Sequence, residues 1–334
     1  MDRVVLVGDL VELREGPLGH ALEAARPFFA ELDEATGGAE LVIVPGNHDH
    51  QLAAGALEAR RSDRPGDPLP VDWSTKDLSG PLAHLAAAVP GADVSLAYPG
   101  VRIREDVYAT HGHYLDWHNT VPSFESLAAS ATSRVTGLRR RTQLTPDDYE
   151  SALAPIYSLL YQLAQTPSTA VRTLAAGSAS TGVWKTLNGR GSRGLRARLL
   201  GDLAVPAAVA VLNRAGLGPL EAEISGPQLR RAALRAIGEV IESLGIDAGH
   251  VIFGHTHRAG PLPGDDPAEW TTPGGARLVN SGSWMYEPAF LGESAGDSPH
   301  WPGGLVIVPE AGPPELRRLL DDAGHEELCG LAAA

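Results

Sequence analysis

The chain has 334 residues, of which 43% are hydrophobic and 20% charged, and it contains a single cysteine. This length and apolar content suffice for a substantial core, and one cysteine excludes both a disulfide framework and a thiolate metal site. The formal charge of -14 disfavours stable binding to nucleic acid or an anionic membrane, because both need a basic surface. No apolar run reaches the roughly eighteen residues that predict a transmembrane helix, so we expect a cytoplasmic protein.

The first two strands predicted along the chain each run into a polar turn. The β-branched run at 3–7 is followed by Gly8-Asp9, and the run at 41–44 by Gly46-Asn47-His48-Asp49. Runs of this kind are typical of buried strands, and glycine lets the chain turn sharply behind them. A lone Gly-Asp or Asn-His pair is usually a surface turn, so neither cluster is informative by itself.

A third strand, predicted at 107–110, runs into His111-Gly112-His113, and the character of the chain then changes. Residues 114–247 have a net charge of +3, whereas the remainder has -17. Two amphipathic helices are predicted there, one starting at Thr145-Pro146 and one starting at Ser225-Gly226 and ending at Gly245. We therefore expect 114–247 to be a helical cap inserted into a core of 1–113 and 248–312, with 313–334 as a C-terminal helix or tail.

Behind the insertion, a strand predicted at 250–253 runs into Gly254-His255-Thr256-His257, and strands at 277–279 and 305–308 are expected to complete the sheet. Four polar clusters thus follow four strands, and open α/β sheets bind ligands beyond the carboxyl ends of their strands. Oxygen and imidazole donors without thiolate suit Mn, Fe, Zn or Co. The sequence therefore predicts a centre for divalent metal ions.

The four clusters, in this order, resemble successive motifs of the calcineurin-like metallophosphoesterases over residues 1–113 and 248 to about 309. The resemblance implies a four-layered αββα sandwich around two metal ions. It implies that Asp9 bridges the metals, that Asn47, His111 and His255 complete the second metal's shell, and that His257 binds the first metal. It also implies that His48 faces the leaving group, with Asp49 orienting its ring.

The family's first motif, an Asp-x-His on the preceding strand, has no counterpart in this sequence. We therefore expect that the N-terminal strand is missing through truncation; the alternative is a protein that works with a depleted first site. Two of the family's ligands are absent in either case. One tightly bound metal ion, and low activity, are accordingly expected for this chain.

The activity implied is hydrolysis of a phosphomonoester, phosphodiester or pyrophosphate bond in a small or lipid-linked substrate. The inserted cap resembles, in arrangement only, that of the UDP-2,3-diacylglucosamine hydrolases. Candidate substrate contacts are His113, Arg139, Arg140, Arg141, Arg190 and Arg193, although such arginines are more often a solvated helix face, and His113 equally fits the lining of the entrance. The competing interpretation is a degenerate member that serves as an interaction scaffold without turnover.

Overall fold

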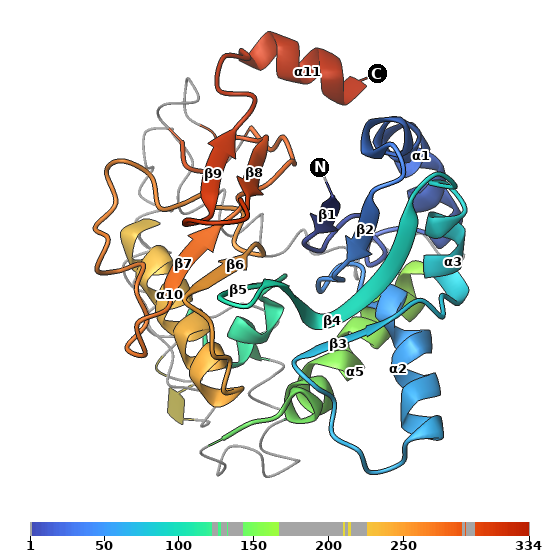
Figure 1. Cartoon of the computed structure of the whole chain (residues 1–334), viewed down its shortest axis with the longest axis horizontal. Coiled ribbons are helices and arrows are strands. Elements are labelled where there is room, and N and C mark those ends of the chain that lie inside the picture. Colours follow the sequence, from blue (N-terminus) through green and yellow to red (C-terminus); the bar gives the residue numbers. More distant parts are fainter. Residues whose placement is uncertain are drawn as a thin grey trace.

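The computed structural model describes residues 2–121, 126–127, 132, 143–166, 210, 213–214, 226–288, 291 and 298–333. They form a mixed α/β structure around a curled central sheet (Figure 1). The strands are β1 Arg3–Leu6, β2 Glu40–Ile43, β3 Asp72–Thr75, β4 Asp93–Arg104, β5 Val107–Thr110, β6 His250–Phe253, β7 Arg277–Asn280, β8 Gly304–Ile307 and β9 Glu315–Arg318. The helices are α1 Leu18–Thr36, α2 Gln51–Asp63, α3 Gly80–Ala86, α5 Pro146–Ala164, α10 Gly226–Ser243, α11 His325–Ala333 and the 3-10 helix η1 His113–Trp117.

The long strand β4 joins two halves of the central sheet, whose order is β1-β2-β4-β5-β6-β7 with β3 beside β4. Its first half is parallel to β2, with Leu96 opposite Ile43, and its second half is antiparallel to β5, with Gly100 opposite Thr110. The carboxyl ends of β2 and β5 therefore approach each other near the middle of β4. Because β1 is parallel to β2, and β6 and β7 are parallel to β5, the turns behind all five strands gather in one region.

The two faces of the sheet have different neighbours, as the alternation of side chains along a strand requires. Leu41 and Ile43 of β2 belong to the main hydrophobic core, together with buried residues of α1, α2, α3, α5 and α10. On the opposite face, Val107 and Ile252 pack with Val306 of the β8–β9 hairpin. The helices thus cover one face, and the hairpin covers part of the other.

Five of the six predicted strands are confirmed in the central sheet, with ends shifted by no more than one residue. The sixth, predicted at 305–308, forms β8 and pairs with β9 outside that sheet, so its assignment to the central sheet is wrong. β9 lies inside the segment 313–334 that was expected to be a helix or tail, and α11 follows it. The hairpin therefore crosses the boundary drawn at residue 312.

The two helices predicted within 114–247 are present as α5 and α10. Thr145 and Asp148 form a capping box at the start of α5, and Gly245 follows α10 with a φ of 62°. Buried residues of both helices, such as Tyr149 and Ile237, pack into the main core rather than into a separate unit. The rest of the expected cap lies mostly outside the described residues, and none of the described helices is long and apolar enough to span a bilayer.

Candidate metal centre

Four side chains from four turns converge behind the strands: Asp9 follows β1, Asn47 β2, His111 β5 and His255 β6. Single ligand atoms of Asp9, His111 and His255 lie within 4.8 Å of one another. The Asn47 Oδ1 atom lies 3.2 Å from His111 Nε2 and 3.1 Å from His255 Nδ1. We call these four residues the metal cluster, because carboxylate, amide oxygen and imidazole are donors that first-row divalent cations accept.

Strained backbone positions this centre. Asp9, His255 and His257 have φ angles of 55°, 64° and 58°, and they are the non-glycine residues with positive φ in the described part of the chain. Each such residue costs about 1 kcal/mol or more relative to an ordinary conformation. All three lie at the centre, and strain of this kind collects at functional sites, where the surrounding structure enforces it.

Gly8 and Gly46 make room for the ring of His111. A Cβ atom on Gly8 would lie 2.3 Å from His111 Nδ1, and one on Gly46 would lie 2.3 Å from Asp9 Oδ1. Neither contact is sterically possible, and the φ of 81° at Gly8 disfavours any other residue there. The glycines of the first two polar turns are therefore required by the packing of the cluster itself.

Second contacts orient both imidazoles of the metal cluster. The Val7 carbonyl oxygen lies 2.9 Å from His111 Nδ1, which leaves Nε2 facing Asp9 and Asn47. Asp116 Oδ2 lies 3.1 Å from His255 Nε2, a charge contact outside hydrogen-bond geometry, which leaves Nδ1 facing Asn47. Groups that hold the far nitrogen of an imidazole fix its orientation and make the near nitrogen a better metal ligand.

The Asp9 carboxylate is anionic in this setting. Its Oδ1 atom accepts a hydrogen bond of 2.9 Å from the His48 backbone amide, and its Oδ2 atom lies 3.2 Å from His111 Nε2. Burial acts to raise the pKa of Asp9, but the charge and hydrogen bond of His111 outweigh it and bring the pKa well below its usual value. The pKa of His111 is raised by the same pairing, although burial opposes the rise. A metal ion and the imidazole proton therefore compete for this pair.

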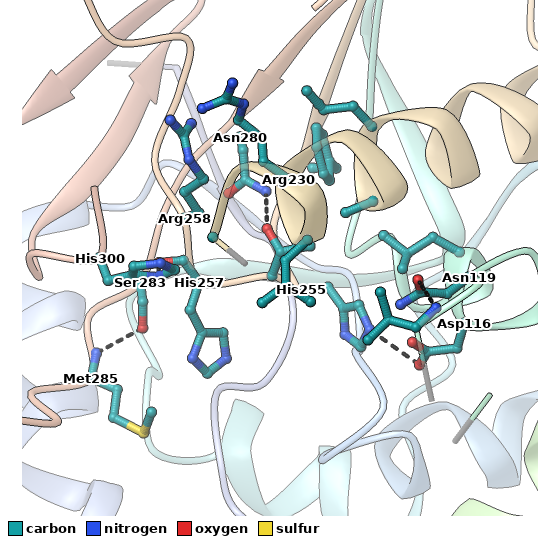
Figure 2. A pocket seen from close by; sticks show the side chains of 18 of the residues that line it. Asp116, Asn119, Arg230, His255, His257, Arg258, Asn280, Ser283, Met285 and His300 are labelled. Atoms are coloured by element: carbon teal, nitrogen blue, oxygen red, sulfur yellow. Dashed lines mark hydrogen bonds and ion pairs between the residues drawn. The ribbon is translucent and has the colours of Figure 1, made fainter. Parts of the chain in front are cut away.

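His257 lies next to the metal cluster and differs from it. Burial is the main cause that lowers the pKa of His257, to about 4, and the charge of Asp9 opposes the shift only in part. The ring is therefore neutral at neutral pH, as a metal ligand must be. Figure 2 shows it on the same turn as His255, with the two rings apart.

His48 is paired with Glu12. The Nδ1 atom of His48 makes a short hydrogen bond to Glu12 Oε2. Burial acts to lower the pKa of His48, but the hydrogen bond to Glu12 and the charges of Asp9 and Glu12 raise it to about 9. The side chain is about one third exposed, so His48 presents a cationic ring at the surface of the centre.

The prediction that Asp49 orients the His48 ring is wrong. Asp49 accepts hydrogen bonds from the backbone amides of Gly46 at 2.6 Å, Leu10 at 2.8 Å and Asp9 at 3.2 Å. Its carboxylate thus joins the turn behind β1 to the turn behind β2. Burial and the neighbouring charge of Asp9 raise the pKa of Asp49 to about 6.

The prediction that His113 touches substrate or lines the entrance is also wrong, because its side chain is only 1% exposed. Its Nε2 atom lies 3.0 Å from the Tyr98 hydroxyl, which donates a 2.6 Å hydrogen bond to Glu150. Burial is the main cause that lowers the pKa of His113 well below its usual value. His113 therefore belongs to a buried polar network between β4, η1 and α5. The other candidate substrate contacts, Arg139, Arg140, Arg141, Arg190 and Arg193, lie outside the described residues.

Two residues of the centre were missed by the sequence reasoning, Glu12 and Asp116. Each lies in the same polar turn as a predicted ligand, Glu12 three positions after Asp9 and Asp116 five positions after His111. Acidic residues close behind a ligand motif were the available signal. Their distances to His48 and His255 depend on how separate turns meet, which spacing along the chain does not encode.

Comparison of the chain with protein-family models, with curated proteins and with solved structures finds no match.

Proposed function

We propose that the chain is a metal-dependent phosphoesterase that hydrolyses a phosphomonoester, phosphodiester or pyrophosphate bond with water as the nucleophile. The observation that carries the proposal is the convergence of Asp9, Asn47, His111 and His255 behind four strands, with His48 beside them. These residues come from the four motifs that resemble the calcineurin-like metallophosphoesterases. The four-layered sandwich of that family is the fold that we propose for the core.

The donor set of the metal cluster fits a divalent cation such as Mn, Fe, Zn or Co. Asp9, Asn47, His111 and His255 would hold one ion, and Asp9 with His257 would hold a second. Bound cations of this kind lower the pKa of water and polarise the phosphoryl group. Since two protein ligands seldom retain a divalent ion against water, we propose one tight and one weak site.

His48 is the proton donor in this proposal. Glu12 occupies its Nδ1 atom, so Nε2 remains to donate a proton to the oxygen that leaves the phosphorus atom. A pKa of about 9 keeps the ring protonated at neutral pH. Glu12 fixes the ring orientation, and Asp49 acts earlier in the chain of support, by holding the two turns together.

The decisive experiment combines metal analysis with turnover. The purified chain is incubated with Mn²⁺ and assayed with p-nitrophenyl phosphate and bis-p-nitrophenyl phosphate, which separate monoester from diester hydrolysis. His255→Ala serves as the inactive variant, and Glu242→Gln, on the exposed side of α10, as the matched control. Metal-dependent turnover that His255→Ala abolishes supports the proposal. Tight metal binding with no turnover on either ester would instead favour the scaffold interpretation.

A further inference from the structure

A pocket of about 380 Å³ opens directly beside the metal cluster, and His255 and His257 form part of its wall. Its other walls come from η1, from the start of α10, and from the turns behind β6 and β7. The volume is within the range of small-molecule sites, which are concave and mostly apolar. A phosphoryl group at the metal cluster would therefore carry its organic substituent into this pocket.

The lining of the pocket is largely hydrocarbon and aromatic. Leu115, Phe253 and Trp270 are nearly fully buried, and Leu234, Ala233 and Leu291 are less than a tenth exposed. Leu229 and the exposed Met285 extend this surface. Surfaces of this kind gain free energy by covering apolar groups and offer few partners to a polar one.

The two arginines of the pocket are already neutralised by acids. Arg258 makes hydrogen bonds of 2.6 and 3.0 Å to both oxygens of Asp265, and Arg230 lies 2.7 Å from Glu269. Figure 2 shows both guanidinium groups together, pointing away from the rings of His255 and His257. A second phosphate would have to break these pairs, so within the described residues the pocket offers no ready site for a second anionic group.

We infer that the substrate is a monoester of phosphate with an apolar alcohol, whose hydrocarbon or aromatic part occupies this pocket and which carries no second phosphate. The inference rests on the proposed function, because the phosphate is placed at the metal cluster. It narrows that function in two ways: it favours an alkyl or aryl phosphate over a nucleotide, and a monoester over a pyrophosphate.

The test is a chain-length series with two readouts. Hydrolysis of ethyl, butyl, hexyl and octyl phosphate with Mn²⁺ gives kcat/KM, and calorimetry gives the affinity of methyl- and octylphosphonate, which contain no ester bond to cleave. Each added methylene is expected to raise kcat/KM and phosphonate affinity about threefold until the pocket is filled, from the free energy of burying one CH₂ group. Uridine diphosphate is expected to bind less tightly than octylphosphonate.

Pocket variants link the effect to this surface. Ala233→Trp fills the pocket from α10, and Leu229→Asn makes a partly exposed part of its wall polar. Both should abolish most of the chain-length dependence, whereas Glu242→Trp, on the exposed side of the same helix, should preserve it. Thermal melting identifies any variant that fails to fold, and Leu229→Asn then decides for Ala233→Trp.

The two proposals fail in different ways. Turnover without dependence on chain length, or tighter binding of uridine diphosphate than of octylphosphonate, overturns the substrate inference and leaves the phosphoesterase intact. Absence of turnover with octylphosphonate still bound tightly, and lost in Leu229→Asn, overturns the hydrolytic function and leaves the pocket assignment. Equal affinity for methyl- and octylphosphonate overturns the pocket assignment whether or not turnover occurs.

Discussion

Two polar clusters border the same pocket, and they are built in opposite ways. In the ion-pair cluster, formed by Arg230, Arg258, Asp265 and Glu269, each cation meets an acid at 2.6 to 2.7 Å. In the metal cluster, by contrast, acceptor atoms of Asn47 and Asp9 and two imidazole nitrogens face one another. One cluster satisfies itself, and the other directs lone pairs toward a shared point.

This difference separates a structural cluster from a ligand site. Opposite charges in contact compensate each other's desolvation, so the ion-pair cluster needs nothing further. Oxygen and nitrogen acceptors that face each other repel unless a proton or a cation lies between them. The strained φ angles of Asp9 and His255 occur only on the metal side of this comparison, since neither arginine nor acid of the ion-pair cluster has a positive φ.

The largest expected effect is the loss of metal binding on His255→Ala. Removing one of four donors, together with its contact to Asp116, should lower affinity for Mn²⁺ at least a hundredfold and abolish turnover. Titration calorimetry and metal analysis after gel filtration measure the effect. Glu269→Gln, a change in the ion-pair cluster, should leave the affinity unchanged, and equal losses in the two variants would contradict the distinction between the clusters.

A smaller effect is expected for the His48–Glu12 pair, which touches no predicted metal donor except through the backbone. His48→Asn should lower kcat about a hundredfold, because it removes the proton donor, and Glu12→Gln about tenfold, because it loosens the ring. Metal content should remain that of the original chain in both. Glu12→Asp should recover part of the loss. A parallel loss of metal in His48→Asn would make His48 a structural support instead.

The third expectation concerns the number of cations. One ion per chain should survive dialysis, and a second should appear only at high Mn²⁺ concentration, because His257 and Asp9 provide fewer donors than the metal cluster. His257→Ala should remove the weak ion and leave the tight one. Calorimetry with Mn²⁺ resolves the two steps. Two ions retained after dialysis would mean that further residues complete the first site.

Much of this centre was predictable, because its residues follow strands immediately. The runs behind β1, β2, β5 and β6 carry Asp9, Asn47, His111 and His255, and glycine precedes three of these four turns or ligands for a steric reason that the structure makes plain. A pattern of strand followed by polar turn depends on neighbouring residues alone. It can therefore be recognised in a single sequence.

The partners of these residues were less predictable, because they depend on how distant turns meet. Asp49 was expected to hold His48, but it is closer to the amides of Gly46, Asp9 and Leu10, and Glu12 takes its place. β4 was missed because Pro99 and Gly100 interrupt its pattern, yet its length places the two halves of the sheet end to end. Helices α5 and α10 were recognised, but sequence periodicity did not show which core they join.

The smallest expected effect tests the ion-pair cluster by its dependence on pH. Burial acts to raise the pKa of Asp265, but hydrogen bonds from Arg258 and the Leu262 amide, with the charges of both arginines, bring it below its usual value. Since the folded-state pKa is lowered, the stabilisation is fully present above the unfolded-state pKa of about 3.9 and is lost as the pH falls through the folded-state pKa.

Asp265→Asn should therefore lower the free energy of unfolding by about 2 kcal/mol at pH 7, the scale of a charged hydrogen bond that leaves Arg258 without its partner. The difference between the two proteins should hold down to about pH 5 and shrink below about pH 4. Denaturant titrations at a series of pH values measure it, and Mn²⁺ affinity at pH 7 should be unaffected. If the difference were the same at pH 3 as at pH 7, the Asp265 carboxylate would not be the source of the stabilisation. If Mn²⁺ affinity fell with it, the two clusters would be coupled, and the self-satisfied cluster would be part of the ligand site after all.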